Sequence, residues 1–448
     1  MHQADLKHDD KVLRDKLETI FQLRRTRSKI NWDRGQYLDL LDAFGNPHLN
    51  LPPVIHVAGT NGKGSIIAIL QAILQAQGLT VHSYTSPHLI HVNERITLVG
   101  QAIDNAYLEQ LIDQALDYNK GAPLSFFEIT TALAFKAFSE TPADILLLEV
   151  GLGGRLDCTN VIDAPLASVI NRISLDHTDF LGDDIRDIAA EKAGIMKADV
   201  PCIIGYQGAG DDARAVNDVL LEEIDSSGAY SCRHGVDWNV CSAGGRMVFS
   251  FDGRDYDFPL PSLQGAHQVQ NAGVALATLF SLRQHIEVSD QAFEDGLTSV
   301  YWPGRLQKLE AAGFDVADNT EIWLDSGHND SAGEALAAEI TQWQVQGERP
   351  LHLVVGMLDT KDSARFLASL LPHLTALHIV SIASDPHSQT KDDIKGSIKE
   401  MRYDVPIYAH DGCVGAIRSI ARDNPSSRIL IAGSVYLAGE ILEHIGGL

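Results

Sequence analysis

The sequence predicts a two-domain α/β protein, and three observations support this prediction. Short apolar segments alternate with helical patterns over the first half of the chain, and the same alternation starts again near residue 320. Several of these segments are continuous apolar runs bounded by small residues, the pattern of strands buried on both faces of a parallel sheet. At 448 residues the chain also exceeds one ordinary core, because a domain typically takes about 100–200 residues.

The first domain is expected to begin with helices over about residues 1–45 and then to form a mainly parallel sheet. Its first strand, LPPVIHVAG, runs into a glycine-rich loop, and the helix that follows the loop ends at Gly78. Further helices are predicted near residues 104–119, 127–139 and 185–196. The other strands of this sheet are predicted at LTVHSYTSP, ADILLLEVG, PLASVIN and VPCIIGY.

A change of pattern separates the two domains. Residues 228–262 combine alternating residues with glycine-rich turns, which predicts a small antiparallel excursion from the parallel sheet. Helical patterns then continue to about residue 298, where the Pro- and Gly-containing segment TSVYWPGRL follows. We therefore predict a first domain over residues 1–298, a linker over 299–305 and a second domain over 306–448.

The second domain is expected to be smaller, Rossmann-like and doubly wound. Each of its apolar strands is followed by a helical stretch, which is the alternation that builds a parallel sheet with helices on both faces. The strands are predicted at EIWLDSG, LHLVVGM, ALHIVSIAS, VPIYAH and RILIAGS.

The charge and cysteine content exclude several classes of function. Lys and Arg total 35 against 60 Asp and Glu, a formal charge of −25, so we expect neither a nucleic acid nor a membrane as partner. Any site for an anion must therefore supply its own cations, helix dipoles or metal ions. The five cysteines include no CxxC pair and predict neither a disulfide framework nor a zinc site. With no signal peptide or long apolar run, a cytoplasmic protein is expected.

The segment VAGTNGKGS is the strongest local signal of a binding site. Its glycines allow backbone N–H groups to approach phosphate oxygens, and Lys63 adds positive charge at the start of a helix. The strict P-loop pattern is not met, because Val57 replaces its first glycine and Gly64 separates Lys63 from the hydroxyl of Ser65. A glycine-rich strand-to-helix turn is the alternative. The strand, lysine and helix together favour a P-loop ATPase-like domain.

Two residues of the first domain follow predicted strands, at the sheet edge where ligands of open parallel sheets bind. Glu149 ends the strand ADILLLEV and can hold the magnesium ion of a nucleotide, although a helix cap or a surface acid is the alternative. His177 follows Asp176 and can act as a metal ligand, an acid or a base. A structural histidine remains the alternative for His177.

Four further residues are candidates for the binding site, and for some of them a structural role is the alternative. Lys192 lies within a predicted helix, where a snorkelling surface lysine is the alternative to a functional one. Arg305 lies in the linker and can reach a phosphate across the cleft, or form a structural ion pair. Asp325 and His328 follow the strand EIWLD, again at a ligand-binding edge.

Taken together, the motifs resemble the folylpolyglutamate synthase and dihydrofolate synthase family, a branch of the Mur ligases. The resemblance covers nearly the whole chain and rests on the order of the motifs. They are HVAGTNGKGS, TSPHL with NERI, EVGLGGRLDCTNVID, DHTDFLG, EKAGI, QGAHQVQNA, WPGRL, LDSGHN and GSVYLAGE. The family's architecture implies that residues 1–298 form an ATP- and folate-binding central domain and that residues 306–448 form a C-terminal glutamate-ligase domain.

The resemblance also implies roles for individual residues. Lys63, Lys192 and His328 would be catalytic, and Lys192 matches a family lysine that is carbamylated and becomes a carboxylate-like metal ligand. Magnesium ligands would be Ser86, Glu149, His177 and Lys192. The nucleotide would be bound by Thr60, Asn61, Gly62, Lys63, Gly64, Ser65, Asn271, Arg305 and Asp325. The folate pocket would be lined by Ser125, Phe126, Phe127, Glu128, Leu156, Asp157 and Cys158.

Two features qualify the resemblance. The family usually has GAHNP where this chain has SGHND from Ser326 to Asp330, and Cys158 stands where alanine is common. Asp157 is associated with pterin binding in bifunctional members, so its presence favours dihydrofolate synthase activity in addition to glutamate extension.

The implied reaction joins L-glutamate to dihydropteroate or to a reduced folate through an acyl phosphate. ATP and two magnesium ions are the expected cofactors, a monovalent cation is a further candidate, and a monomer is expected. A folylpolyglutamate synthase alone, or a Mur-type ligase with another acceptor, is the alternative. Because GTNGKGS begins by residue 59, little room remains for the N-terminal domain of a peptidoglycan-precursor ligase. A regulatory ATP-binding protein is disfavoured by the complete metal set.

Overall fold

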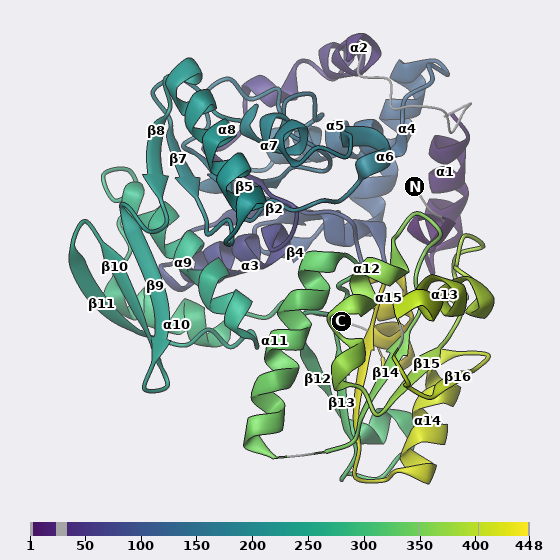
Figure 1. Cartoon of the computed structure of the whole chain (residues 1–448). Coiled ribbons are helices and arrows are strands. Elements are labelled where there is room, and N and C mark those ends of the chain that lie inside the picture. The colour runs from purple at the N-terminus through teal and green to yellow at the C-terminus, as the bar shows by residue number, and fades with distance from the viewer. Residues whose placement is uncertain (1–2, 24–33, 348, 402, 447–448) are drawn as a thin grey trace.

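The computed structural model describes residues 3–23, 34–347, 349–401 and 403–446. In Figure 1 two bodies lie one above the other, and the chain passes from the upper to the lower body after helix α10. Each body contains a sheet that is mainly parallel, so the predicted α/β fold class is confirmed. The exact domain boundaries stay a prediction.

The sheet of the first domain follows the order β4-β3-β2-β5-β1-β6-β7-β8. Strands β2, β5, β1, β6, β7 and β8 are parallel, whereas β3 and β4 form an antiparallel edge that the sequence analysis missed. The strands are β1 (Val54–Ala58), β2 (Val81–Tyr84), β3 (Ile96–Leu98), β4 (Gln101–Ala102), β5 (Ile145–Glu149), β6 (Ala167–Ile170), β7 (Pro201–Ile204) and β8 (Tyr230–Arg233).

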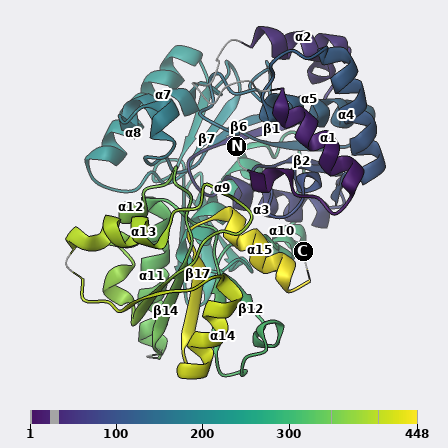
Figure 2. The same ribbon diagram turned by 90° about the vertical axis from the view of Figure 1, so that its right-hand side faces the viewer.

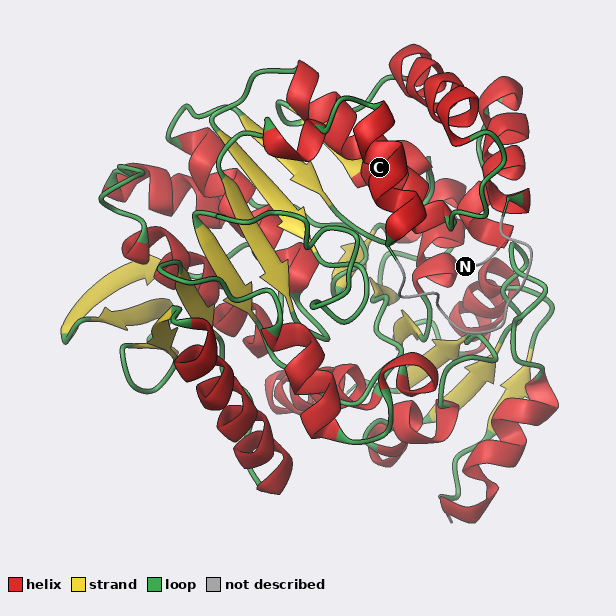
Figure 3. Cartoon of the chain, turned by 90° about the horizontal axis from the view of Figure 1, so that it is seen from above, coloured by secondary structure: helices red, strands yellow, loops and turns green. Residues whose placement is uncertain are grey.

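Helices cover both faces of this sheet (Figure 3). One face packs against α3, α9 and α10, and the other packs against α1, α2, α4 and α5 at one end and α7 and α8 at the other. This double coverage explains why the strands are continuous apolar runs. The helices are α1 (Lys11–Gln22), α2 (Gly35–Ala43), α3 (Lys63–Ala76), α4 (Asn105–Asn119), α5 (Phe126–Glu140), α6 (Thr178–Leu181), α7 (Ile185–Ala193), α8 (Asp211–Ser227), α9 (Ala266–Ser281) and α10 (Asp290–Ser299).

The predicted antiparallel excursion begins later than expected. Strand β8 belongs to the large sheet, because it pairs with β7 in parallel. The antiparallel part is a separate sheet in which β10 pairs with both neighbours. Its strands are β9 (Trp238–Ala243), β10 (Arg246–Phe251) and β11 (Arg254–Pro259), and it lies at the left margin of the upper body in Figure 1.

The second domain contains a sheet of order β12-β13-β17-β14-β15-β16. Strand β12, which was not predicted, pairs with β13 in an antiparallel way, whereas the other strand pairs described in this sheet are parallel. Helices α14 and α15 pack against one face, and α11, α12 and α13 pack against the other. The elements are β12 (Gln307–Leu309), β13 (Glu321–Leu324), α11 (Asp330–Gln346), β14 (Leu351–Val355), α12 (Ser363–Ala368), β15 (Ala376–Ile379), α13 (Lys391–Ile398), β16 (Ile407–Ala409), α14 (Cys413–Asp423), β17 (Arg428–Ala432) and α15 (Val435–His444).

Figure 2 shows the N-terminal helix α1 and the C-terminal helix α15 near the junction of the two bodies. Part of the predicted N-terminal helical region, residues 24–33, lies outside the described residues. Across the ranges that the structure describes, no helix combines the length and the apolar character needed to cross a bilayer.

A buried histidine in β1 makes the stability of the first domain depend on pH. His56 lies 2.8 Å from the Thr159 hydroxyl through Nε2, and burial lowers its pKa to about 3. The imidazole titrates near 6.5 in the unfolded chain. The part of the unfolding free energy that depends on neutral His56 is therefore fully present above pH 6.5 and is lost as pH falls toward 3.

We expect His56→Gln, which can still donate to Thr159, to reduce this loss. Between about pH 7 and pH 4.5, the wild type should lose about 2–3 kcal/mol more unfolding free energy than the variant. Urea unfolding at both pH values measures the difference, and equal losses in the two proteins would contradict the assignment.

Candidate active site

A cavity of about 1870 Å³ lies between the two domains. It is placed where strands of both parallel sheets end, the edge at which ligands of such sheets bind. The predicted site residues that line it are Thr60, Asn61, Gly62, Lys63, Gly64, Ser65, Ser86, Ser125, Phe126, Phe127, Glu128, Glu149, Leu156, Asp157, Cys158, His177, Asn271, Arg305, Asp325 and His328. The structure thus brings residues from distant segments to one cavity, while their individual roles stay predictions.

The glycine-rich loop between β1 and α3 is fixed by the segment that follows β6. The backbone N–H of Thr60 donates to the Arg172 carbonyl at 2.9 Å. The Thr60 hydroxyl donates to the Ser174 carbonyl and accepts from the Ser174 N–H, both at 3.0 Å. The amide of Asn171 donates to the Asn61 carbonyl at 2.9 Å. The loop is therefore held in shape before any ligand binds.

Two glycines of the loop have no space for a side chain. A Cβ on Gly62, whose φ is +83°, would lie 2.4 Å from Asn171 Nδ2. A Cβ on Gly64 would lie 2.9 Å from Nε1 of Trp302, an indole in the segment between the two domains. The packing of Trp302 on the first turn of α3 explains one of the two departures from the strict P-loop pattern, the glycine that follows Lys63.

Lys63 is folded onto its own loop. Its ammonium donates to the carbonyls of Gly59 at 3.0 Å and Thr60 at 3.2 Å, and lies 3.8 Å from Glu149 Oε1. Since Glu149 is only 4% exposed, burial raises its pKa, and the nearby Lys63 opposes that rise. This arrangement places a cation at the N-terminus of α3, where the helix dipole also favours anions.

Two of the predicted metal ligands, Ser86 and Glu149, lie next to one another at the cavity. Glu149 accepts the Ser86 N–H at 3.1 Å, so a carboxylate and a hydroxyl-bearing residue are adjacent. The buried hydroxyl of Ser65 has no hydrogen-bond partner within the described ranges. In the part of the chain that the structure describes, no three His, Cys, Asp or Glu side chains form a metal cluster. Phosphate oxygens and water would complete the coordination, as is usual for magnesium.

Lys192, on α7, is not among the residues that line the cavity, but the charges of the cavity residues Lys63, Asp176 and Asp157 act on its amine. It is 6% exposed, so the alternative of a snorkelling surface lysine is wrong. Burial lowers the pKa of its amine to about 7, and Lys63 contributes to the shift. A lysine with this pKa is partly neutral near pH 7, the form that can react with an electrophile.

Both predicted histidines of the cavity are neutral near pH 7. Burial, with Lys361 as the next cause, lowers the pKa of His177 to about 3 and that of His328 to about 4. His328 Nδ1 lies 3.0 Å from the Ser326 carbonyl, which can only accept, so Nδ1 carries the proton. Nε2 of His328 therefore retains a lone pair for a ligand or a proton.

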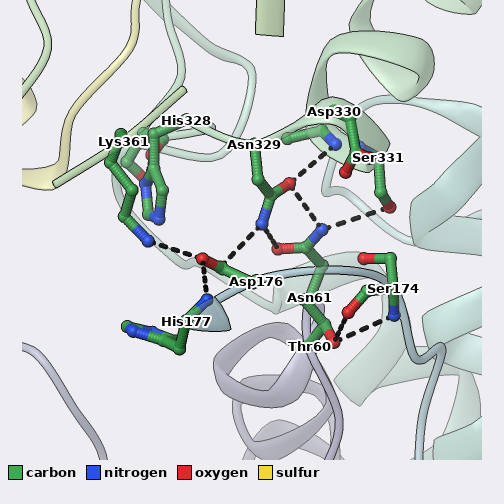
Figure 4. A network of polar contacts seen from close by, with 12 residues as sticks. Thr60, Asn61, Ser174, Asp176, His177, His328, Asn329, Asp330, Ser331 and Lys361 are labelled. Carbon is green, nitrogen blue, oxygen red and sulfur yellow. Dashed lines mark hydrogen bonds and ion pairs between the residues drawn. The ribbon is translucent and has the colours of Figure 1, made fainter. Parts of the chain in front are cut away.

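A network of hydrogen bonds crosses the cavity between the domains (Figure 4). The Asp176 carboxylate pairs with the Lys361 ammonium at 2.7 Å, and it accepts from the Asn329 amide at 3.0 Å. Asn329 also forms two hydrogen bonds, at 2.9 and 3.1 Å, with Asn61 of the glycine-rich loop, residues 59–65, which we name the phosphate loop. The sequence analysis missed Lys361 and the role of Asn329, although both follow buried strands, β14 and β13, at the ligand-binding edge.

Aromatic and acidic side chains form another part of the cavity wall. Ser125 and Glu128 make a capping box at the start of α5, with hydrogen bonds of 3.2 and 2.6 Å, so part of their role is structural. The Arg95 guanidinium lies 5.4 Å from the centre of the Phe126 ring. Buried Asp157 accepts from the Thr159 hydroxyl at 2.6 Å and from the Leu152 N–H at 2.8 Å.

The segment between the domains is tied to the second domain by Asp325. Its carboxylate accepts the N–H groups of Leu306 at 2.8 Å and Gly327 at 2.7 Å. Arg305 donates to the Gly304 carbonyl at 3.1 Å, and no ion pair of its guanidinium is found among the residues that the structure describes. Arg305 lines the cavity as a cation, which favours a ligand over the structural ion pair considered from the sequence.

We predict that Gly64→Ala weakens nucleotide binding, because its Cβ would press on Trp302. Overpacking of this kind costs about 1–3 kcal/mol, so the affinity for ADP should fall about tenfold. Trp302→Phe, added to Gly64→Ala, should restore part of the affinity, and Trp302→Phe alone is the control. Calorimetric titration with ADP measures all four proteins, and an unchanged affinity of Gly64→Ala would refute the packing explanation.

Comparison with known proteins identifies both halves of the chain. The Mur ligase middle domain matches residues 57–279, and the dihydrofolate synthetase C-terminal domain matches residues 308–444. The dihydrofolate synthase/folylpolyglutamate synthase of Escherichia coli is 37% identical over 396 residues, which are 88% of this chain and 87% of that protein.

Two solved structures resemble the whole chain. E. coli FolC in complex with DHPP and ADP has a TM-score of 0.84 at 28% identity and covers 98% of each chain. A bifunctional folylpolyglutamate synthase/dihydrofolate synthase with Mn, AMPPNP and L-glutamate bound has a TM-score of 0.79 at 28% identity, covering 94% of this chain and 96% of its own.

Some relatives are longer. The chain spans about half the length, 49% and 48%, of proteins from Haloferax volcanii and Halobacterium salinarum, named probable bifunctional folylpolyglutamate synthase/dihydropteroate synthase. By contrast, it matches the E. coli relative over most of both lengths. The chain therefore belongs to the dihydrofolate synthase/folylpolyglutamate synthase family of the Mur ligase superfamily.

Proposed function

We propose that this chain is an ATP-dependent ligase that joins L-glutamate to dihydropteroate and to reduced folate (poly)glutamates. The observation that carries the proposal is the 1870 Å³ cavity between the domains. The phosphate loop, the acidic residues beside it, the aromatic pocket around Asp157 and the cations of the second domain all line this cavity. A nucleotide, an extended acid and an amino acid can thus meet in one site. One chain supplies both walls, so a monomer suffices.

The proposed reaction proceeds in two steps. A carboxylate oxygen of the folate-type acid attacks the γ-phosphorus of ATP, the bond from this phosphorus to the β,γ-bridging oxygen breaks, and ADP leaves. The product of this step is an acyl phosphate. The amine of L-glutamate then attacks the acyl carbon, phosphate leaves, and the nitrogen loses a proton. Because phosphorylation turns a poor leaving group into a good one, the protein's contribution is mainly positioning and charge stabilisation.

The chain's own cations and neutral imidazoles suit these steps. Lys63, at the start of α3, would neutralise charge on the transferring phosphoryl group, and Arg305 would reach it from the segment between the domains. The lone pair on Nε2 of His328 would accept the amine proton, because its Nδ1 already donates to a carbonyl.

Magnesium is part of the proposal. Two ions would be held by Ser86, Glu149, His177 and a modified Lys192, with a monovalent cation as a further candidate, and would supply positive charge to the phosphates. The neutral state of His177 and the burial of Glu149 suit metal ligation. A folylpolyglutamate synthase alone, or a Mur-type ligase for another acceptor, is the alternative.

We expect purified protein to release ADP from Mg-ATP only when L-glutamate and an acceptor acid are both present. Dihydropteroate and a reduced folate monoglutamate are tested in parallel, and product masses are followed by mass spectrometry. Lys63→Ala should reduce turnover at least about a thousandfold, whereas Lys395→Ala, on the exposed side of α13, should not. Absence of ADP release with either acceptor would reject the proposed function.

The contribution of Asp157 is tested with the same two acceptors. If Asp157 binds the pterin, Asp157→Asn should lower kcat/KM about tenfold or more for dihydropteroate, and less for the folate. Equal losses would remove this assignment, because Asp157 also holds the Leu152 and Thr159 N–H groups, and their release would affect both acceptors.

Lys192 is expected to carry a carbamate. Because burial lowers its pKa to about 7, a large fraction of the amine is neutral and can react with carbon dioxide. Lys192→Ala should abolish turnover, and an added short-chain carboxylate should restore part of it. Lys197→Ala is the control, because Lys197 is another lysine whose pKa burial lowers. Native mass spectrometry in bicarbonate should show one added carbon dioxide in the wild type and none in Lys192→Ala.

A further inference from the structure

Asn61 belongs to the phosphate loop, yet its side chain contacts the second domain. Its Nδ2 donates to Asn329 Oδ1 at 2.9 Å and to the Ser331 hydroxyl at 3.2 Å. In return, Asn329 Nδ2 donates to Asn61 Oδ1 at 3.1 Å. Figure 4 shows these two amides facing one another, joined by hydrogen bonds. The result is a reciprocal amide pair between the domains.

The orientation of the Asn329 amide is fixed because one of its other partners is a hydrogen-bond donor and the other is an acceptor. Asn329 Oδ1 accepts the backbone N–H of Ala332 at 3.0 Å as the N-cap of α11, and a backbone N–H can only donate. Asn329 Nδ2 donates to the Asp176 carboxylate at 3.0 Å, and an ionised carboxylate can only accept. A flipped Asn329 amide would lose both bonds. The side chain therefore presents one defined donor and acceptor pattern to Asn61.

Asp176 connects the pair to a second contact between the domains. Its carboxylate forms the ion pair with Lys361 at 2.7 Å and accepts the His177 N–H at 2.8 Å. Both side chains of the ion pair are largely buried, at 12% and 14% exposure. Lys361 and Asn329 are thus held by one carboxylate of the first domain, so the pair forms where the second domain is docked.

The other side of Asn61 is attached to the first domain. Its carbonyl accepts from the Asn171 amide, and the next residue, Gly62, opens α3 without space for a Cβ. Lys63 follows and forms the first residue of α3. A displacement of Asn61 would consequently move the backbone that positions Gly62 and Lys63. Asn61 therefore connects the second domain directly to the backbone of the phosphate site.

We propose that Asn61 and Asn329 are a positioning pair that couples docking of the second domain to the shape of the phosphate loop. The inference rests on the proposed ligase function and extends it. Phosphoryl transfer would be fast only when the second domain is docked, so the acyl phosphate would form in a cavity already closed to water. The backbone of Asn61 would help to form the phosphate site, while its side chain would contact Asn329 only when the second domain is docked.

The test is a double-mutant cycle with Asn61→Ala and Asn329→Ser. Serine keeps an N-cap for α11 but is too short to complete the amide pair. Each single variant should lower kcat about tenfold to a hundredfold with ADP affinity within about threefold of wild type, a split that general loss of structure would not give. Glu334→Gln is the control, because it removes another contact between the domains, the exposed 3.1 Å Arg172–Glu334 ion pair. The Thr60 N–H is bound by the Arg172 backbone carbonyl, which this substitution leaves in place.

If the two asparagines act as a pair, the double variant should be no more than about threefold slower than the slower single variant. Losses that multiply in the double variant would overturn the proposal, because each residue would then act alone. Asn329→Asp provides a second variant that also keeps the cap and places a carboxylate opposite Asp176. It should reproduce the loss of kcat, and wild-type turnover would count against the pair.

Small-angle X-ray scattering separates this inference from the proposed function. Asn329→Asp should show a larger radius of gyration than wild type and Glu334→Gln, whether or not any substrate turns over. If the wild type lacks ligase activity, the proposed function fails while the scattering result still decides the docking role. Equal radii for Asn329→Asp and wild type would overturn that role.

Discussion

The close packing around the phosphate loop is the constraint on which the rest of the site depends. The loop has neighbours from three parts of the chain: Asn171 after β6, Trp302 between the domains, and Asn329 at the start of α11. Because Cβ atoms fit at neither Gly62 nor Gly64, the loop sequence is restricted by these neighbours as well as by phosphate. The same packing joins the positions of the linker and of the second domain to the nucleotide site.

The cavity carries cations although the chain as a whole is strongly negative. A protein of formal charge −25 is a poor attractor of anions, but Lys63 and Arg305 line the cavity together with Lys361. Burial, and then the charge of Lys361, lowers the pKa of both His177 and His328, so that both are neutral. Positive charge is therefore concentrated on groups that line the cavity, while both imidazoles there are neutral.

The sequence was sufficient for features encoded within a few residues of one another. Apolar runs predicted the parallel strands, and the loop after β1 was predicted from glycines, a lysine and a following helix. The pairing of β8 with β7 was not predictable from alternation, because period two does not say which edge a strand joins. The pairing of Asp176 with Lys361 depends on domain docking, which leaves no local pattern in either segment.

The departure of residues 326–330 from the usual family motif can now be judged from its contacts. The N–H and the hydroxyl of Ser326 both donate to the Gly304 carbonyl at 2.9 Å, so the serine adds a bond between β13 and the segment between the domains. Asp330 occupies the first turn of α11, where a carboxylate interacts favourably with the helix dipole and where proline is also tolerated. Asn329 keeps its cap and its contact with Asn61. The changed residues therefore alter how the segment is attached, while the contact that reaches the phosphate loop is retained.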